Sequence, residues 1–502
     1  FIVWLVCLSR YFHRRSLTIS ASFPFWKRGV VVLVGACLIG LCIFGIRGRT
    51  GYNPIKVSAA YFCQDAFLNQ LGVSPTFNLL TSVMDDMRPE NKYLHLMDEQ
   101  EAITKAQALL NRQGDANVSP LAVYRHAAKA DSVQQRRPNV VLIMMESMSS
   151  KLMKHFGQSE TLTPFLDSLY TRSISFRNFY SAGIHTNHGL YATLYSFPAM
   201  MKRNLMKGSV IPRYSGLPTV LKENGYYNLF FMTHEGQYDN MNAFFRTNGY
   251  DEVFSQEDYP ADKVVNSFGV QDDFLYDYAI PVLNQRAATG QPFFATLLSI
   301  SNHPPYVIPP FFHPKTSEPE MQIVEYADWA LRQFFEEARK QPWFDNTIFV
   351  LEGDHGKLVG DAECELPESY NHIPLMIYSS RIHPEEKNTF GGQVDIQPTI
   401  LGLLNIDYLQ NNFGVDLLKE ERPCMFYTAD NMIVGRNDTL LYLYNYETQQ
   451  ELTYDIGNGK LNAVPMDDSF LPLKEYSFSM LQSAEFLVKH GKTVNSVPFT
   501  QQ

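Results

Sequence analysis

The sequence has few cysteines and lacks the spacings that would give them a structural role. It contains six among 502 residues, and no two form a Cys-x-x-Cys pair. This excludes a zinc ribbon and a disulfide-stapled scaffold. The six divide into three in or beside apolar runs and three scattered singly, which are Cys7, Cys37 and Cys42, then Cys63, Cys364 and Cys424. A bridge between Cys364 and Cys424 is left open.

A basic stripe, an internal repeat and a low-complexity tract are also missing. The formal net charge is −10, from 42 Lys and Arg against 52 Asp and Glu, which argues against a nucleic-acid-binding protein. The remaining composition is that of a globular protein, with 45% apolar and 19% charged residues. The length allows one large domain with additions, or two to three domains.

The N-terminal region, residues 1–50, carries the longest apolar runs. Because the first residue is Phe1, we expect a fragment or a processed chain, in which residues 1–9 are the tail of a membrane helix. Gly29–Ile46 is an unbroken apolar run with basic flanks, at the lower limit of length for a membrane-spanning helix. A buried core helix is the alternative. A signal peptide is disfavoured because an apolar run precedes this one and no small-residue cleavage site follows it.

The loop charges predict the orientation of this region. Five basic residues and no acid lie between the two apolar runs, whereas fewer basic residues follow the second run before Asp65. The more basic loop is expected in the cytoplasm. Everything after Arg47 is therefore predicted to be extracytoplasmic, in a multi-pass membrane protein.

Residues 51–137 are predicted to form a linker and residues 138–502 a globular domain. Met97–Arg112 has strong helix formers with acids in its first turn, which predicts a linker helix. Pro138, directly before a buried apolar run, marks the domain boundary. The predicted strands are Val140–Met145, Tyr227–Met232, Phe293–Ser299, Ile348–Leu351, Leu375–Tyr378 and Met425–Tyr427.

Helical patterns separate these strands. They are Thr163–Arg172, Ser215–Asn224, Gln322–Lys340 and Gln397–Leu404. This alternation predicts an α/β fold with a mostly parallel sheet covered by helices on both faces. Leu440–Tyr446 and Glu451–Asp455 predict a small antiparallel addition near the C-terminus.

Four of the predicted strands end in side chains that bind metals or move protons. Glu146 follows the first strand, His234 the second and His303 the third, while Asp354 and His355 follow the fourth. Ligand-binding groups of open α/β sheets stand at the carboxyl ends of their strands. One such residue is more often structural, but four at one edge predict a shared site.

Asp354 and His355 are the sharpest pair because they are adjacent on a glycine-flanked turn. With Glu146 they offer oxygen and nitrogen ligands suited to Mn²⁺, Zn²⁺ or Mg²⁺. The alternative is that Asp354 only caps the following turn. Thr186 lies in a polar, glycine-bearing stretch that leads into a helix. A hydroxyl at a helix N-terminus suits phosphoryl transfer, although Thr186 read alone is also an ordinary helix N-cap.

These residues resemble those of the lipoteichoic acid synthase-type phosphoglycerol transferases, in the alkaline phosphatase/sulfatase superfamily. The resemblance covers roughly residues 138–455 and the order of membrane helix, linker and catalytic domain. It is carried by Glu146, Thr186, His303, Asp354-His355 and the downstream run Gly391-Gly-Gln-Val-Asp395-Ile-Gln-Pro-Thr-Ile-Leu401.

The resemblance implies a function. One divalent metal, typically Mn²⁺, would be bound by Glu146, Thr186, Asp354 and His355. Thr186 would be the nucleophile that takes a phosphoglycerol group from a phospholipid such as phosphatidylglycerol and passes it to a glycan or glycolipid. His303 would contact the phosphate or assist the leaving group. The implied location is the bacterial cell (inner) membrane.

One departure concerns the head group. Synthases of this family carry a Trp-Asn-Arg stretch, whereas the corresponding positions here are Asp239-Asn240-Met241. We predict that His234, His303 and Arg246 bind substrate, although Arg246 on a helix is more often a surface charge. Phosphoethanolamine transfer and phosphodiester hydrolysis are therefore alternatives, and an inactive envelope-binding scaffold is a third.

Sulfate-ester hydrolysis is rejected from the sequence. It requires a formylglycine precursor in the pattern Cys or Ser-x-Pro-x-Arg. The nearest match, Ser196-Phe-Pro198-Ala-Met200, lacks the arginine.

Overall fold

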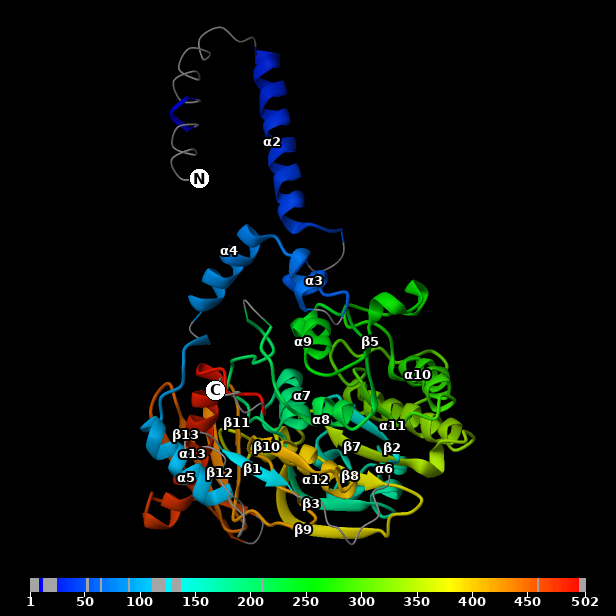
Figure 1. Cartoon of the computed structure of the whole chain (residues 1–502), viewed down its shortest axis with the longest axis vertical. Helices are drawn as coiled ribbons and strands as arrows, with labels where there is room; N and C mark the ends of the chain where they lie inside the picture. The colour runs from blue at the N-terminus through cyan, green and yellow to red at the C-terminus, as the bar shows by residue number, and fades with distance from the viewer. Residues whose placement is uncertain are drawn as a thin grey trace, which may run out of the picture. The chain divides into compact units, whose positions relative to one another are not determined.

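The computed structural model describes residues 9–11, 25–50, 54–63, 66–88, 91–110, 123–127, 137–208, 211–457 and 460–495 (Figure 1). The chain divides into two compact units, Phe1–Lys56 and Val57–Gln502. The expected partial helix at residues 1–9 lies outside the described residues except for Ser9.

The first unit contains α2 (Phe25–Arg47), which confirms the helix expected over residues 29–46. Residues Gly29–Arg47 are long and apolar enough to cross a membrane, and none of them is buried within the described structure. This contradicts the alternative of a core helix, since a core helix is covered by its own protein. Insertion of α2 into a membrane stays a prediction.

The second unit begins with the linker elements η1 (Val57–Ala60), α3 (Ala66–Leu71), α4 (Pro75–Asp86) and α5 (Glu99–Leu110). The predicted linker helix is confirmed as α5, which starts at Glu99 because the Asp98 carboxylate accepts hydrogen bonds from the next free N–H groups. α5 buries its apolar face against α13 (Leu471–Lys489). Farther along, β1 (Tyr124–Ala127) pairs with β10 (Tyr408–Asn411).

An eight-stranded sheet, in the order β5-β4-β6-β2-β7-β8-β3-β9, forms the centre of this unit. Its strands are β2 (Asn139–Met145), β3 (Ile174–Tyr180), β4 (Tyr227–Met232), β5 (Glu252–Phe254), β6 (Phe293–Leu298), β7 (Thr347–Gly353), β8 (Leu375–Tyr378) and β9 (Glu385–Gly392). Only β8 runs antiparallel to its neighbours, so the predicted mostly parallel sheet is confirmed.

Helices cover both faces of this sheet because its central strands are apolar on both sides. Alternate residues of β2 enter two separate cores, with Val140 and Leu142 in one and Val141 and Ile143 in the other. The first core includes α7 (Thr186–Tyr195), α8 (Leu217–Glu223), α9 (Met241–Thr247) and α12 (Ile396–Leu403). The second includes α6 (Pro164–Tyr170), α10 (Asp272–Ala287) and α11 (Pro319–Ala338).

The antiparallel addition is larger than predicted. It has five strands in sequential order, which are β11 (Met425–Thr428), β12 (Met432–Arg436), β13 (Leu440–Asn445), β14 (Gln450–Gly457) and β15 (Lys460–Ala463). The placement of Met425–Tyr427 in the main sheet was therefore wrong, since this segment is β11 of the second sheet. A short apolar run is equally suited to a strand of the main sheet and to a strand of the antiparallel sheet. Only its pairing with β12 shows to which sheet the segment belongs.

Candidate functional site

The carboxyl edge of the main sheet brings the predicted residues together. β2 and β7 are paired in parallel register, with Met145 opposite Gly353. Glu146 and Asp354 are therefore the first residues beyond two neighbouring strands. β3 runs parallel to β9 and antiparallel to β8, so its end lies at the same edge and leads into Thr186 at the start of α7.

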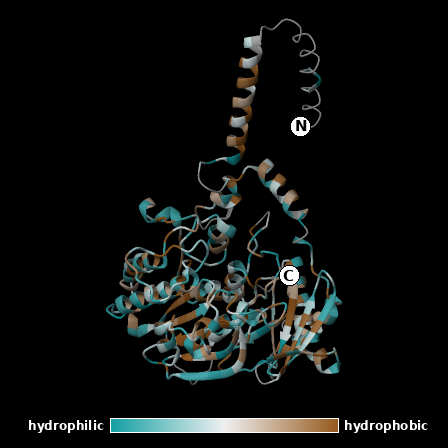
Figure 2. Ribbon diagram, turned by 180° about the vertical axis from the view of Figure 1, so that it is seen from behind, coloured by the Kyte–Doolittle hydropathy of each residue, from teal (hydrophilic) through white to brown (hydrophobic). Residues whose placement is uncertain are grey.

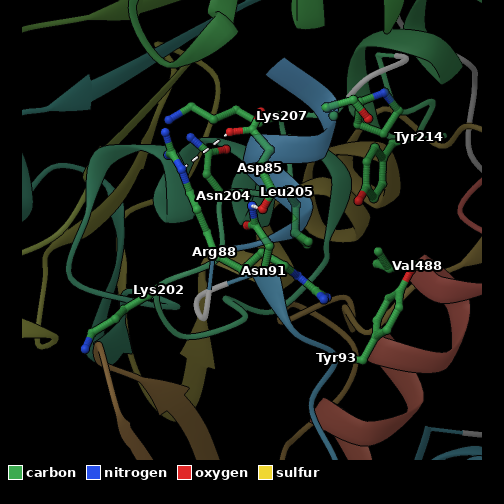
Figure 3. Close-up of a pocket in the computed structure, with 14 residues that line it drawn as sticks. Asp85, Arg88, Asn91, Tyr93, Lys202, Asn204, Leu205, Lys207, Tyr214 and Val488 are labelled. Atoms are coloured by element: carbon green, nitrogen blue, oxygen red, sulfur yellow. Dashed lines mark hydrogen bonds and ion pairs between the residues drawn. The ribbon is translucent and has the colours of Figure 1, made fainter. Parts of the chain in front are cut away.

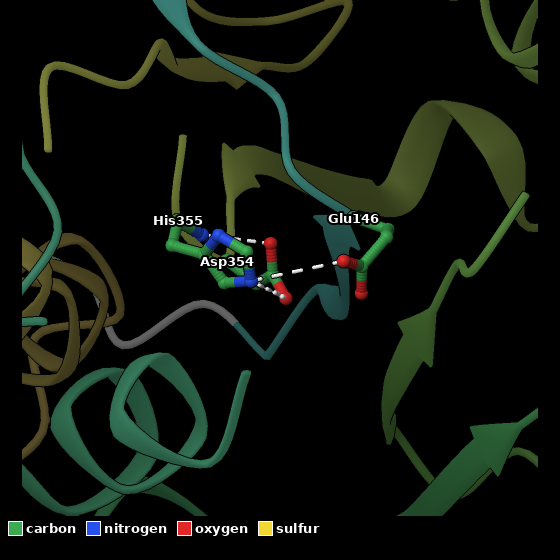
Figure 4. Close-up of side chains that lie close together, drawn as sticks. All are labelled: Glu146, Asp354 and His355. Carbon is green, nitrogen blue, oxygen red and sulfur yellow. Dashed lines mark hydrogen bonds and ion pairs between the residues drawn. The ribbon is translucent and has the colours of Figure 1, made fainter. Parts of the chain in front are cut away.

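Glu146, Asp354 and His355 form one cluster, in which one ligand atom from each lies within 4.8 Å of the others. His355 Nε2 lies 3.7 Å from Glu146 Oε1 and 3.6 Å from Asp354 Oδ2. Figure 4 shows the three side chains converging from opposite sides on one point. Both carboxylates are buried and the imidazole is half-buried.

The backbone around the cluster fixes one face of each carboxylate. Asp354 Oδ1 accepts hydrogen bonds from the N–H groups of Ser147, at 2.8 Å, and His355, at 2.7 Å. The Ser147 hydroxyl donates to Glu146 Oε1 at 2.7 Å. Ser147 has a φ of 51°, a left-handed conformation of the kind that concentrates at functional sites.

The protein's own groups do not fully compensate the two carboxylates of this cluster. Burial raises the pKa of the Glu146 carboxyl well above its ordinary value, and the adjacent Asp354 carboxylate raises it further. Asp354 Oδ2 is buried and has no hydrogen-bond partner among the described residues. Buried carboxylates need a hydrogen bond, a counter-charge or a metal. Two carboxylates and an imidazole with one orphaned oxygen form a donor set that fits one divalent cation.

Thr186 lies beside this donor set as the first residue of α7. Its Oγ1 is 3.4 Å from Glu146 Oε2 and donates toward it. The side chain provides no cap for its own helix, whose N-cap position is occupied by His185. If Thr186 were the N-cap, α7 would begin at Asn187. The helix begins at Thr186 itself, so the alternative that Thr186 is the N-cap is wrong.

His234 and His303 belong to one line of aromatic rings. The His234 ring lies 4.6 Å from Tyr238, Tyr238 lies 6.2 Å from Phe268, and Phe268 lies 4.0 Å from His303. Burial lowers the pKa of His234 to about 4, so its imidazole is neutral at pH 7. Burial, then the Asp239 and Glu146 carboxylates, raise the pKa of Tyr238 to about 12.

Arg246 lies on α9, where its guanidinium already has protein partners. Its Nε donates to Asn242 Oδ1 at 2.7 Å and one terminal nitrogen donates to the Val253 carbonyl at 3.3 Å. The first contact lies within α9, and the second links α9 to β5. Binding of a substrate head group by Arg246 stays a prediction.

Lys357 was not predicted from the sequence. In the loop after β6, His303 was predicted as a site residue and Asn302 was not. The Asn302 amide donates to the carbonyls of Glu146 and Ser147, and its oxygen accepts from Lys357 Nζ at 2.8 Å. Burial lowers the pKa of Lys357 to about 8, against the opposing effect of Glu320 and Glu146. The sequence showed only that Lys357 follows His355 by two residues. That spacing does not predict in which direction the Lys357 side chain points.

A second group lies next to Thr186, and of its members Asp239 was named from the sequence whereas Asn187 and Lys207 were not assigned a role. The Asn187 amide donates to Asp239 Oδ2 at 3.2 Å, and Lys207 Nζ lies 2.8 Å from Asp239 Oδ1. Asp239 and Asn240 both have left-handed backbones, with φ values of 46° and 69°. Residues 239–241, where the resemblance expects Trp-Asn-Arg, therefore place an acid and its lysine partner beside the predicted nucleophile.

Cys364 and Cys424, whose pairing the sequence left open, are both free. Cys364 is half-buried and its thiol donates to the Leu366 carbonyl at 3.0 Å, while Cys424 is buried. No disulfide joins them.

Comparison with known proteins finds relatives among the lipoteichoic acid synthases. The chain is 25% identical over 350 residues to lipoteichoic acid synthase 1 of Bacillus subtilis, covering 64% of this chain and 53% of that protein. It is 23% identical over 374 residues to the lipoteichoic acid synthase of Staphylococcus aureus, covering 66% and 54%. The chain thus spans about half the length of the curated relatives it matches.

Solved structures show the same fold. A protein of the alkaline phosphatase superfamily from Vibrio parahaemolyticus superposes with a TM-score of 0.72 at 25% identity, over 81% of this chain and all of that one. The lipoteichoic acid synthase LtaP from Listeria monocytogenes superposes with a TM-score of 0.63 at 19% identity, over 78% and 98%. The fold is that of alkaline phosphatase, as predicted. The sulfatase family matches residues 138–406, which is more than half of the sequence, and the chain therefore belongs to the sulfatase family.

Proposed function

We propose that this chain is an extracytoplasmic, metal-dependent transferase that moves a phosphoglycerol group from a phospholipid to a glycan or glycolipid through a phosphothreonine at Thr186. The observation that carries the proposal is the position of Thr186 Oγ1, 3.4 Å from Glu146 in a cluster completed by Asp354 and His355. The similarity to lipoteichoic acid synthases supports the choice of phosphoglycerol as the group.

Glu146, Thr186, Asp354 and His355 would hold one divalent cation, for which we propose Mn²⁺. When bound, such a cation stabilises alkoxide on a hydroxyl and negative charge on a phosphoryl oxygen. The roles of the chain's own residues follow from their positions. The buried carboxylates orient the Thr186 hydroxyl, and the rigid start of α7 keeps its oxygen aimed at the substrate.

The first half-reaction exchanges one phosphorus–oxygen bond for another. The Thr186 hydroxyl gives its proton to solvent and its oxygen bonds to phosphorus, the bond between phosphorus and the diacylglycerol oxygen breaks, and that oxygen gains a proton. We assign the delivery of this proton to His303, whose ring is half-buried against Phe268. In the second half-reaction an acceptor hydroxyl loses its proton, takes the phosphoglycerol group and returns the hydroxyl to Thr186.

A second reaction is favoured by one specific observation. Asp239, in place of the expected tryptophan-containing stretch, lies within hydrogen-bond distance of Asn187 beside the nucleophile. A carboxylate there suits the ammonium of a phosphoethanolamine group, although Lys207 already pairs with it. Phosphoethanolamine transfer, or hydrolysis of the phosphothreonine by water, is therefore the alternative activity of the same site.

The test is to incubate the full chain and Mn²⁺ with phospholipids that differ only in head group. We expect diacylglycerol release and an intact-mass increase of one phosphoglycerol, both lost by roughly 10³-fold or more in Thr186→Ala. Thr171→Ala, which removes an exposed threonine, is the matched control. An adduct of phosphoethanolamine mass would select the second reaction. If no lipid gave an adduct or diacylglycerol, the chain would be an inactive envelope-binding scaffold.

A further inference from the structure

The linker helix α4 exposes a continuous apolar stripe. Pro75 occupies its first turn, and the Ser74 hydroxyl accepts from the Phe77 N–H at its start. The side chains along the stripe are 49–77% exposed, and they are Leu79, Leu80, Val83, Met84 and Met87. Spacings of three and four residues between members of the stripe place all of them on one side of the helix. An apolar patch of this kind marks a contact with another protein or with a membrane.

The opposite side of α4 faces a basic pocket. Ser82 and Asp85 line a cavity of about 240 Å³ together with residues of the segment 202–214. Figure 3 shows Asp85, Arg88 and Lys207 on one side of this cavity and Tyr93 and Tyr214 on the other. The lining contains four cations, Arg88, Lys202, Arg203 and Lys207, but only one acid, Asp85.

Three of these cations are exposed enough to exchange their partners for a ligand. Arg203 is buried in a bidentate pair with Glu485 and belongs to the architecture. The Lys202 and Lys207 side chains are 45% and 48% exposed in their ion pairs, and that of Arg88 is 55% exposed. Exposed ion pairs contribute little free energy. A phosphate entering the pocket can therefore recruit these three cations at small cost.

Contacts with the rest of the domain are made by residues on both sides of α4 in the sequence. Before the helix, the Asn242 amide of α9 donates to the Tyr61 carbonyl at 2.9 Å. After it, the Arg203 guanidinium lies over the Tyr93 ring at 5.6 Å, and the Leu96 N–H donates to Gln482 of α13 at 2.7 Å. Both anchors lie within the Val57–Gln502 unit. The domain therefore holds the helix with its apolar side uncovered.

Two successive side-chain contacts connect the basic pocket to the residue after the proposed nucleophile. Lys207 lines the pocket and lies 2.8 Å from Asp239, which accepts from the Asn187 amide at 3.2 Å. Asn187 is the residue after Thr186 on α7. Only Asp239 and Asn187 therefore lie between Lys207 and Thr186 along this series of contacts.

We propose that α4 and this pocket form a docking surface for an anionic phospholipid at a bilayer surface. The apolar stripe lies in the acyl region, and Arg88, Lys202 and Lys207 bind the phosphate of the head group. A bilayer is favoured over a protein because the same chain carries α2, which is apolar and long enough to cross a membrane. Figure 2 shows apolar residues along both α2 and α4. The cations are not on α4 itself: Arg88 follows the helix, and Lys202 and Lys207 belong to the segment beside it. Basic side chains next to an apolar surface favour binding to an anionic membrane.

The claim that the docked lipid donates the transferred group rests on the proposed function. Binding of the lipid does not depend on turnover. The two are therefore separated by one experiment that measures lipid contact and another that measures transfer.

Lipid contact is measured on the full chain in nanodiscs of mixed anionic and zwitterionic phospholipid. p-Benzoylphenylalanine is placed at Val83 or, as the control, at the equally exposed apolar position Phe311. Irradiation is expected to give phospholipid-mass adducts at position 83 and none at 311, with the anionic lipid enriched over its share of the bilayer. Adducts to a second copy or to another protein, or equal lipid labelling at both positions, would overturn the proposal.

The pocket is tested by the same enrichment. Arg88→Ala is expected to lower the enrichment of anionic lipid about fivefold, the effect of one basic residue at an anionic surface. Arg381→Ala removes an exposed arginine elsewhere and should leave it unchanged. Unchanged enrichment in Arg88→Ala would assign the head group to another site and contradict the pocket.

Transfer then decides whether the docked lipid is the donor. Leu80→Glu is expected to lower turnover of bilayer phospholipid about tenfold more than turnover of a soluble short-chain phospholipid, since roughly two CH₂ equivalents leave the bilayer. Leu471→Glu, also at an exposed leucine, is the control. Equal loss on both substrates would overturn the delivery role. No turnover of either lipid by the unmodified chain would sink the proposed function and leave the crosslinking result to judge the docking surface.

Discussion

Two buried acidic centres of this domain differ in how completely the protein satisfies them. Asp395 is paired with the buried Arg422 through several hydrogen bonds and also accepts the N–H of Val415 at 2.8 Å. Glu146 and Asp354 are equally buried, yet they lie side by side and leave one Asp354 oxygen without a hydrogen-bond partner among the described residues. Burial alone therefore does not mark a site. A buried acid whose charge the protein leaves uncompensated does.

The largest expected effect is on the satisfied centre. Asp395→Asn leaves the Arg422 guanidinium buried opposite a neutral group, which should lower the free energy of unfolding by about 3–5 kcal/mol. Urea unfolding of the detergent-solubilised chain measures the loss. Glu447→Gln, at an exposed ion pair with Lys202, is the control and should stay within about 0.5 kcal/mol. A loss as small as that of the control would end the contrast between the two centres.

The unsatisfied centre should respond to a cation. Mn²⁺ at a hundred times its dissociation constant is expected to raise the free energy of unfolding by about 2.7 kcal/mol, because it compensates Glu146 and Asp354 only in the folded state. Thermal unfolding with and without a chelator measures this gain. Glu146→Gln should lose most of it, whereas Asp395→Asn should retain it despite lower stability. Full retention in Glu146→Gln would remove Glu146 from the metal site.

Without the cation the same variant should be more stable than the unmodified protein. Glu146→Gln removes a carboxylate that burial and Asp354 both disfavour, and relieving one poorly satisfied buried polar group is worth about 1–2 kcal/mol. Unfolding in the presence of chelator measures the difference. Destabilisation of the size expected for Asp395→Asn would show instead that Glu146 is structural.

The sequence predicted one half of this site better than the other. Glu146, Asp354 and His355 follow continuous apolar runs, which are confirmed as β2 and β7, and parallel pairing then brings their ends together. Thr186 reaches the same edge from β3, which was missed because its polar and charged residues, such as Arg177 and Asn178, interrupt the apolar pattern. Spacing within a strand is local information, whereas the pairing of β3 with β8 and β9, far along the chain, is not.

The same reasoning explains the other errors. Met425–Tyr427 has the apolar run of a core strand, and only its long-range pairing places it in the antiparallel sheet. Lys357 and Lys207 enter the site region through contacts with residues 55 and 32 positions away in sequence, Asn302 and Asp239. The apolar stripe of α4 is exposed because the rest of the domain leaves it uncovered, and this depends on contacts that are distant in the sequence.

A third acid lies between the two extremes and gives the smallest expected effect. Burial alone would raise the pKa of Glu368, but the Arg436 guanidinium and then His372 outweigh it and hold that pKa at about 2. Because the folded-state pKa lies below the ordinary value, the stabilisation is complete above about pH 4.5 and is lost as the pH falls through 2. The side chain is 42% exposed, so the contribution should be under about 1 kcal/mol.

The measurement is the difference in unfolding free energy between the unmodified chain and Glu368→Gln as the pH is lowered. The gap should stay constant from pH 7 to pH 5 and close toward pH 2, where protonated Glu368 resembles glutamine. A gap that persists at pH 2 would mean that shape and hydrogen bonding at Glu368 matter more than its charge. Closure would rank the three acids by compensation: Asp395 is buried beside a buried cation, Glu368 is partly exposed beside the buried Arg436, and Glu146 has no counter-charge that the described chain supplies in full.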